Sequence, residues 1–269
     1  MTEDAARSGP VLLSFEPDGI AWLRLNRPDA ANGMNMELLE ALHAAIMRIH
    51  RQPRVRAVIL SGEGKNFCAG GDVRDFASHG EGLPDHLREA TARLNAAVSA
   101  LVQLEPPVIA AVHGFAAGGG GFGLVCAADF VIAADSARFF SGAVRVGMAP
   151  DAGATVTLSR LVGLRKAMEI LLTNPTLTAQ EALEAGLITK VVPADAVRDE
   201  ALALARALSA LPPKAVAATK RLVWRGVGAS LEDQLPEEAR TVAELSGTAD
   251  AREGLAAVIE RRPPRFTGK

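Results

Sequence analysis

Strand-like and helix-like apolar patterns alternate along the first part of the chain, and their order limits the folds open to it. Residues 11–15 and 20–25 read as strands, and the apolar residues between 38 and 49 then recur at helical spacing. Asn35 stands where it can cap that helix, and residues 55–60 follow as a buried strand. This strand, helix, strand order predicts an α/β fold.

The same alternation continues through the middle of the chain. A long helix is predicted over residues 87–101, and Pro106 with Pro107 stops it. The next predicted elements are a strand at residues 108–112, a small-residue helix at 121–127, a strand at 130–133 and an irregular span at 141–153. Functional groups often lie on such irregular spans.

The last third of the chain is predicted to be helical. Thr178 and Glu181 form a capping box, and Gly186 falls where that helix would end, before a strand at residues 188–192. From Asp195 onward the patterns are helical, with breaks at Pro212, at residues 226–228 and near Gly247. We therefore expect an α/β core over residues 1–194 and a helical domain over residues 195–269.

Chain length and net charge limit the kinds of partner that this protein can bind. The 269 residues can bury one sizeable core, or a main domain with a helical appendage. A net charge of −2 offers no basic field for nucleic acid or an anionic membrane, so a small molecule or another copy of the chain is the expected partner. The N-terminus is acidic and polar, and no apolar run has membrane-spanning length, which predicts a soluble cytoplasmic protein.

The two cysteines do not indicate a disulfide or a metal centre. Cys68 and Cys126 lie far apart, without CxxC spacing or a nearby histidine pattern. We interpret both as packing residues and predict no metal site.

Carboxylates are scarce where glycines are dense. Between Pro106 and Met168 the acidic residues are Asp129, Asp135 and Asp151, and the same stretch contains four consecutive glycines at residues 118–121. This combination points to backbone donors with one carboxylate rather than to a carboxylate pair. Asp129, at a helix-to-strand junction, and Asp135, in a turn, are interpreted as structural.

Three patterns compete to explain the glycines. Gly118, Gly120 and Gly123 match GxGxxG after a strand, but no acidic residue follows about 20 residues later to hold a ribose. Residues 62–65 hint at a phosphate loop, but the Walker spacing fails. In the third reading, residues 69–72 and the four-glycine turn are two strand ends that open into helices and aim N–H groups at one oxygen. This third reading makes chemical sense and is the one we favour, and the weak GxGxxG match leaves a nicotinamide dehydrogenase as a distant alternative.

Several motifs in one order resemble the enoyl-CoA hydratase/isomerase family, also called the crotonase family. They are residues 25–28, 67–72, 112–129, 147–153 and 185–188, with Phe266 and Lys269 at the end. The resemblance implies a spiral of β-β-α units with a C-terminal α-helical trimerisation region, and trimers often paired into hexamers. It also implies an acyl-CoA thioester as substrate, with coenzyme A as part of that substrate and no separate cofactor.

The resemblance assigns the oxyanion hole to backbone N–H groups of Gly71 and Gly120. This turn has one glycine more than the family pattern, so Gly119 and Gly121 remain alternatives for the second donor. The N–H groups would stabilise the thioester enolate that forms when an α-proton leaves.

The catalytic acids depart from the hydratase pattern. Family hydratases carry two glutamates, whose positions here are Gly123 and Ala143. Asp151 stands where some family isomerases carry an aspartate, and burial would raise its pKa toward neutrality. The alternative role for Asp151 is to cap a helix that begins near Ala154.

The resemblance also implies the groups that bind the substrate. For coenzyme A they are Ala69, Asp72, Val73, Arg27, Lys65, Phe266 and Lys269, the last two often reaching it from a neighbouring subunit. For the acyl group they are Phe76, Phe140, Val144 and Met148. Asp75, His79 and His86 border this pocket, where one could supplement Asp151, although solvated surface is the simpler role. His113 is expected to make a structural hydrogen bond.

Three functions follow from this reading. The first is an acyl-CoA double-bond isomerase with Asp151 as its single base. The second is a hydratase or another lyase of the family with a relocated acid. The third is a catalytically inert relative that binds coenzyme A.

Overall fold

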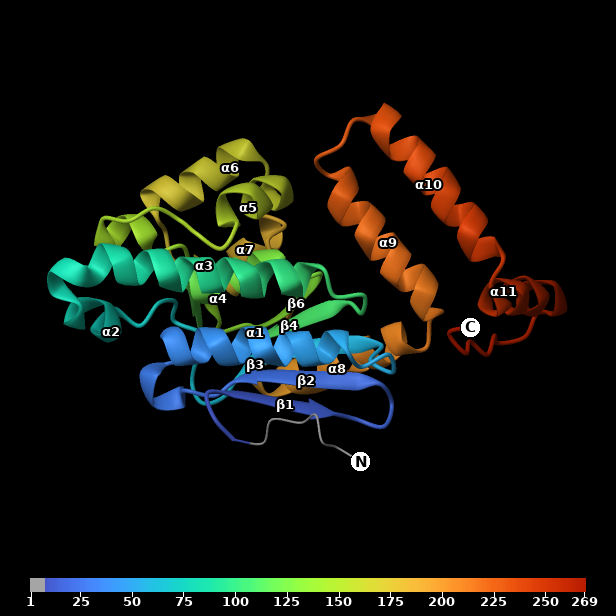
Figure 1. Cartoon of the computed structure of the whole chain (residues 1–269), viewed down its shortest axis with the longest axis horizontal. Helices are drawn as coiled ribbons and strands as arrows, with labels where there is room; N and C mark the ends of the chain where they lie inside the picture. The colour runs from blue at the N-terminus through green and yellow to red at the C-terminus, as the bar shows by residue number, and fades with distance from the viewer. Residues whose placement is uncertain (1–7) are drawn as a thin grey trace.

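A mostly parallel sheet carries the core of the chain. The structure, a computed structural model, describes residues 8–269 and is shown in Figure 1. Within these residues the main sheet has the order β1-β2-β3-β4-β6-β9. Its strands are β1 (Val11–Phe15), β2 (Ile20–Leu25), β3 (Ala57–Gly62), β4 (Val108–Val112), β6 (Phe130–Ala134) and β9 (Lys190–Val192). Only β1 with β2 is antiparallel, and the predicted α/β class is confirmed.

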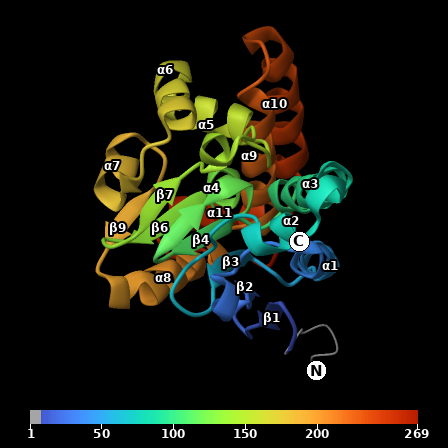
Figure 2. The same ribbon diagram turned by 90° about the vertical axis from the view of Figure 1, so that its left-hand side faces the viewer.

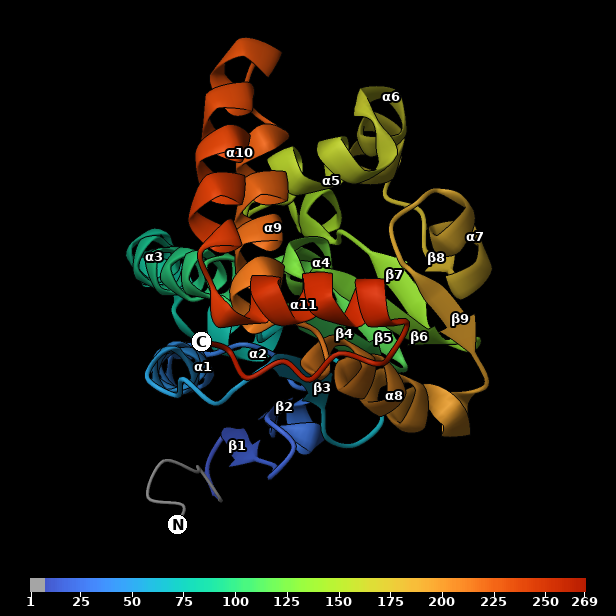
Figure 3. The same cartoon turned by 90° about the vertical axis from the view of Figure 1, so that its right-hand side faces the viewer.

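The central strands are buried on both faces. Every residue of β4 is buried, as are the first four residues of β3. Parallel strands covered on two sides have this nearly continuous apolar character. Helix α4 (Gly118–Ala127) lies on one side of the sheet and α8 (Val197–Ser209) on the other, as Figures 2 and 3 show.

The first helix forms as its sequence predicts. The Asn35 side chain accepts a hydrogen bond from the Leu38 N–H at 3.0 Å and so caps α1 (Met36–His50). The buried residues of this helix are Leu38, Leu39, Leu42, Ala45, Ile46 and Ile49. α1 packs against α3 (Leu83–Val102), which is the second long helix of the prediction.

A second, smaller sheet was not predicted. Its order is β5-β7-β8, and its strands are β5 (Phe115–Ala117), β7 (Arg138–Phe140) and β8 (Leu177–Thr178). Segments of two or three residues are too short to show a strand period. β5 leads directly into α4, which begins at Gly118 rather than at the predicted residue 121.

Shorter elements connect the core to its surroundings. They are η1 (Pro28–Ala30), α2 (Val73–Ser78), η2 (Gly80–Gly82), η3 (Ala143–Val146), α5 (Ala154–Val162), α6 (Leu164–Met168), η4 (Glu169–Thr173), α7 (Ala179–Glu184) and η5 (Ala194–Ala196). The predicted capping box is confirmed, because the Thr178 side chain accepts from the Glu181 N–H and the Glu181 carboxylate accepts from the Thr178 N–H. Gly186 follows α7 with φ +77°, as expected for a helix end.

The C-terminal third is helical, as predicted. α9 (Pro213–Gly226) and α10 (Leu231–Ser246) form a pair that stands to the right of the sheet in Figure 1, and α11 (Ala249–Glu260) follows. α8, by contrast, packs against β3, β4 and β6. The division at residue 194 and the trimerisation of this region remain predictions. Within residues 8–269 no helix combines the length and apolar character needed to cross a membrane.

A buried ion pair joins α9 to the sheet. The Lys220 ammonium lies 2.7 Å from Asp129 Oδ2, and their side chains are 8% and 12% exposed. The same carboxylate accepts from the Val108 N–H at 2.7 Å and from Trp224 Nε1 at 2.8 Å. Burial lowers the pKa of Lys220, and the charge of Asp129 opposes that shift. The structural role predicted for Asp129 fits this network.

Replacing Asp129 by Ala is expected to destabilise the fold by about 3–5 kcal/mol, because it leaves the Lys220 charge buried without its partner. Urea unfolding at a fixed protein concentration measures the change. Asp85→Ala, which breaks the exposed Asp85–Arg88 pair, is the control and should change stability little. Equal effects of the two substitutions would contradict this role for Asp129.

Candidate active site

Two glycine turns from distant parts of the sequence meet in the middle of the molecule. Cys68 pairs with Ala116 through an isolated bridge, and Met34 pairs with Gly71 through another. Gly70 and Gly118 have φ angles of +98° and +60°, which favour glycine. A Cβ on Gly118 would lie 2.9 Å from the Gly70 Cα, so side chains at these positions would force the turns apart.

Free backbone donors gather where these turns meet. The Gly71 N–H has no hydrogen-bond partner within residues 8–269. The N–H groups of residues 118–120 lie in the first turn of α4 and so have no carbonyl acceptor within the helix, and Ala117 offers no side-chain cap. The Gly121 N–H, the fourth in the helix, faces the Ala117 carbonyl in regular helical geometry. The Gly121 N–H is thus engaged within α4, whereas the N–H groups of Gly118, Gly119 and Gly120 are free to donate to a ligand.

Asp151 lies directly against the start of α4. A Cβ on Gly119 would overlap the Asp151 carboxylate, so the glycine makes room for the acid. Burial raises the pKa of Asp151, and a hydrogen bond from its own N–H opposes the shift. α5 begins at Ala154 after Gly153 and has no side-chain cap. The alternative that Asp151 caps this helix is therefore wrong.

The donors and the acid border one cavity of about 670 Å³, called here the central cavity. It is lined by Met34, Leu39, Ala69, Gly71, Val73, Phe76, Ala77, Leu83, Leu87, Ala90, Thr91, Leu94, Gly118, Gly119, Gly120, Phe140, Gly142, Ala143, Arg145, Val146, Met148, Ala149 and Asp151. Among these described residues Asp151 is the one that carries a carboxylate. The walls are otherwise mostly apolar, which suits an apolar ligand with one reacting polar group.

Neither expected glutamate position supplies an acid. Ala143 lines the cavity without a functional group. Gly123 is buried, and a Cβ there would lie 2.6 Å from the Ala152 Cβ rather than in the cavity. A longer side chain at residue 123 would therefore have to displace the loop that carries Asp151.

The predicted acyl-pocket residues divide into two groups. Phe76, Phe140 and Met148 line the central cavity. Val144 does not line it and is 43% exposed, because the 3₁₀ turn of η3 directs this residue outward. The Phe76 ring lies against Gly71, where a Cβ would overlap it. Phe76 therefore packs directly against Gly71 in the first turn.

The residues predicted to bind coenzyme A lie in different environments. Ala69 and Val73 line the central cavity. Asp72 caps α2 through the N–H groups of Arg74 and Asp75 and pairs with Arg27 at 3.0 Å. Desolvation raises the pKa of Asp72, but these hydrogen bonds and the Arg27 charge outweigh it, and the pKa is lowered. Arg27 also donates to the Gly33 carbonyl, so its charge is already engaged.

The other three predicted groups lie away from the cavity. Lys65 is exposed and makes no side-chain hydrogen bond or ion pair within the described residues. Phe266 packs near Gly254 on α11. The Lys269 carbonyl accepts from the N–H groups of Ala249 and Asp250. Within one chain Phe266 and Lys269 do not reach the central cavity.

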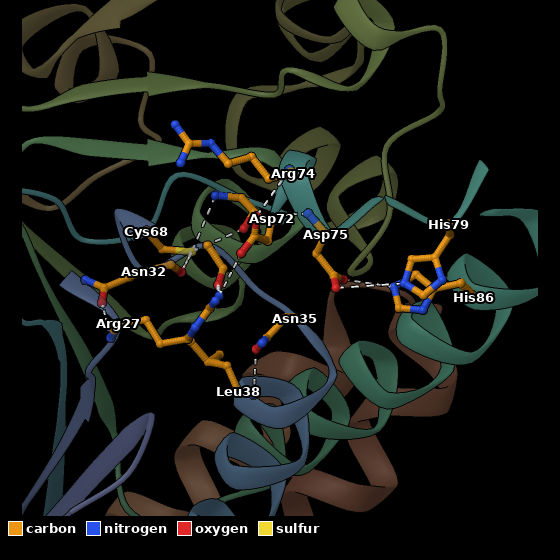
Figure 4. Close-up of polar contacts among 12 residues, drawn as sticks. Arg27, Asn32, Asn35, Leu38, Cys68, Asp72, Arg74, Asp75, His79 and His86 are labelled. Carbon is orange, nitrogen blue, oxygen red and sulfur yellow. Dashed lines mark hydrogen bonds and ion pairs between the residues drawn. The ribbon is translucent and has the colours of Figure 1, made fainter. Parts of the chain in front are cut away.

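Asn32 holds the first turn in place, and sequence reasoning missed it. Its amide donates to the carbonyls of Glu63, Asn66 and Phe67 at 2.9, 2.8 and 3.2 Å. The Cys68 thiol contacts the Asn32 carbonyl at 3.1 Å, as Figure 4 shows, and burial raises the pKa of this thiol to about 12. Both cysteines are buried and free, which confirms their packing role. A fully buried Asn in a turn-like run leaves little sequence signal.

The histidines do not reach the acid. His113 Nε2 lies 3.0 Å from the Gly64 carbonyl, which fits the structural hydrogen bond predicted for it. Asp75, His79 and His86 contact one another beside the cavity, but none is among the described residues that line it. In this structure they cannot supplement Asp151 directly.

Comparisons with known proteins place the chain in a family. A family model described as enoyl-CoA hydratase/isomerase matches residues 16–269. A protein of Rhodobacter capsulatus named probable enoyl-CoA hydratase is 40% identical over 94% of this chain and 96% of its own length. A protein of Escherichia coli named 1,2-epoxyphenylacetyl-CoA isomerase is 36% identical over 96% of this chain and 98% of its own.

The fold comparison agrees. A crystal structure of enoyl-CoA hydratase from Bacillus anthracis superposes with a TM-score of 0.91 at 33% identity, covering 97% of this chain and 100% of the other. The chain belongs to the enoyl-CoA hydratase/isomerase family, and its fold is the crotonase fold.

Asp151→Asn is expected to stabilise the protein at neutral pH. A carboxyl with a raised pKa in the folded state binds its proton more tightly there than in the unfolded chain, so stability falls as pH rises above the ordinary value of 3.8. Neutral Asn avoids this loss, and its advantage should shrink toward acid pH. Urea unfolding across pH measures it, with exposed Asp135→Asn as the control. A loss of stability at neutral pH would contradict the burial effect.

Proposed function

We propose that the chain is an acyl-CoA double-bond isomerase in which Asp151 is the single base. The observation that carries this proposal is the one carboxylate on the central cavity, beside the free N–H groups of two glycine turns. A 1,3 shift needs one group that removes a proton and returns it, whereas hydration benefits from two.

The reaction begins with the thioester carbonyl between the Gly71 N–H and the N–H of Gly120, with Gly119 as the alternative donor. In a 3-enoyl thioester Asp151 takes a proton from carbon 2, and the electron pair moves into a dienolate whose charge rests on the carbonyl oxygen. Two N–H groups, one of them at the N-terminus of α4, stabilise that oxygen by several kcal/mol. Asp151 then returns the proton to carbon 4, and the double bond ends between carbons 2 and 3.

The cavity walls suit this substrate class. Apolar residues from α3 and the loop after β7 would surround the acyl chain, and Ala69 with Val73 border the side where coenzyme A would enter. Coenzyme A belongs to the substrate, and no separate cofactor is proposed. Arg27, Lys65 and Asp72 would contribute to binding coenzyme A.

Oligomers would complete this site. Phe266 and Lys269 lie in the segment after α11, packed against that helix and away from the cavity of their own chain. In a homotrimer or a hexamer they would reach coenzyme A bound to a neighbouring subunit. We place the enzyme in the cytoplasm.

Relatives support two candidate reactions. The Escherichia coli relative is named an isomerase, in line with the single acid. The relative from Rhodobacter capsulatus is named a hydratase, which keeps hydration as the second candidate. A hydratase would have to position water with Asp151 alone, because Gly123 and Ala143 replace the expected pair of acids. A chain that binds coenzyme A without turnover is the third candidate.

Incubation with a 3-enoyl-CoA should give the conjugated 2-enoyl-CoA, which is measured by its ultraviolet absorbance. Asp151→Asn should lower kcat roughly a hundred- to ten-thousandfold, the usual loss on removing a general base. Asp135→Asn is the matched control and should retain activity. Hydration of a 2-enoyl-CoA that survives Asp151→Asn would refute the proposal, and binding without turnover would favour the inert relative.

The pH profile should report the same acid. Because Asp151 must be ionised to accept a proton and its pKa is raised, kcat/KM should fall on the acid side at a pH above the ordinary aspartate value of 3.8. Circular dichroism at each pH separates this loss from unfolding. An acid limb at or below the ordinary value would mean that Asp151 is not the base or is not desolvated in the free enzyme.

A further inference from the structure

Three side chains with metal-binding atoms converge where α2 meets α3. His86 Nε2 lies 3.1 Å from Asp75 Oδ2, and His79 Nε2 lies 3.8 Å from Asp75 Oδ1. The two imidazole rings are stacked, with centroids 3.6 Å apart. Figure 4 shows both rings facing the Asp75 carboxylate. One ligand atom from each residue lies within 4.8 Å of the others.

Local structure explains why they meet. Asp75 and His79 are four residues apart and so lie on one face of α2 and its C-terminal end. The turn at residues 80–82, with Gly80 at φ +50°, reverses the chain, and His86 follows in the first turn of α3. His86 is 10% exposed and its ring edge contacts Phe76, while Asp75 and His79 are 30% and 36% exposed. The cluster is therefore anchored on one side and open on the other.

The donor set selects a class of ion. Two imidazole nitrogens with one carboxylate oxygen suit zinc and other first-row transition metals, whereas Mg²⁺ and Ca²⁺ prefer sites made of oxygen alone. Donors about 2.0–2.2 Å from a tetrahedral zinc lie roughly 3.3–3.6 Å apart. His86 Nε2 and His79 Nε2 lie 3.1 and 3.8 Å from different oxygens of Asp75, so the imidazole rings must rotate out of their stacked arrangement to bring both nitrogens and one oxygen onto a single ion.

We propose that Asp75, His79 and His86 bind a divalent first-row transition metal, with water in the remaining position. Nε2 of each histidine and one carboxylate oxygen of Asp75 are the ligands. The sequence predicted no metal site, because the spacing of these residues follows no familiar motif. This proposal does not depend on the proposed isomerase reaction.

The metal would join two walls of the central cavity. Phe76 and Ala77 on α2 and Leu83 and Leu87 on α3 line the cavity, and each lies within three residues of a proposed ligand. Closing this link would hold α2 against α3 and limit movement of the Phe76 ring that lies against Gly71. We therefore assign the site a structural role beside the acyl pocket rather than a role in proton transfer.

The test is zinc binding by chelator-treated protein without an affinity tag, measured by calorimetry and by the melting temperature. The full-length chain should bind one equivalent, and zinc should raise its melting temperature because it binds the folded state. His86→Gln and His79→Gln should each weaken binding at least about tenfold and abolish the shift. His43→Gln, which removes a histidine of α1 outside the cluster, is the control and should bind as the parent does.

Asp75→Asn separates a metal site from a simple hydrogen-bonded triad. Asn keeps the shape and an acceptor for His86 but loses the negative charge, so it should fold normally and still bind zinc at least about tenfold more weakly. Absence of zinc binding by the parent protein would overturn the proposal. Binding that persists unchanged in Asp75→Asn, His79→Gln and His86→Gln would also overturn it, because the ion would then lie elsewhere.

Discussion

The close approach of two glycine turns is the constraint on which the rest of this structure depends. A Cβ on Gly70 would lie 3.1 Å from the Gly118 Cα and a Cβ on Gly118 would lie 2.9 Å from the Gly70 Cα, and both residues adopt φ angles that favour glycine. This contact brings the Gly71 N–H, which follows a strand-like bridge, beside the unpaired N–H groups of α4. Hydrogen bonds from Asn32 to the preceding loop keep the first turn in this position. The positive ends of these N–H dipoles therefore point at one place in a mostly apolar cavity.

The same close packing determines where a carboxylate side chain can lie. The space that a side chain at residue 119 would fill is occupied by the Asp151 carboxylate, and the space beside residue 123 is occupied by Ala152. The glycine-rich start of α4 and the single aspartate are thus parts of one arrangement, in which the acid takes the room that the helix gives up. Burial that raises the pKa of this acid is a cost to stability, of the kind that active sites commonly carry.

Residues with a local physical role could be read from the sequence. The Asn35 cap, the capping box at Thr178 and the long buried strands follow from short-range rules, and the structure confirms them. The small sheet that contains β7 was missed because strands of two or three residues show no period. α4 begins three residues before its predicted start because tertiary contacts, not helix propensity, favour glycine there. The outward turn of Val144 and the meeting of His79 with His86 depend on side-chain directions that spacing alone does not fix.

A crystal structure with a bound acyl-CoA analogue tests the central claim most directly. The account predicts that the thioester oxygen accepts from the Gly71 N–H and from the N–H of Gly120 or Gly119, at about 2.7–3.1 Å each. It also predicts that the Asp151 carboxylate stands over carbons 2 and 4 of the acyl chain. A carbonyl oxygen bound away from these two turns, or an acyl chain whose carbons lie out of reach of Asp151, would contradict it.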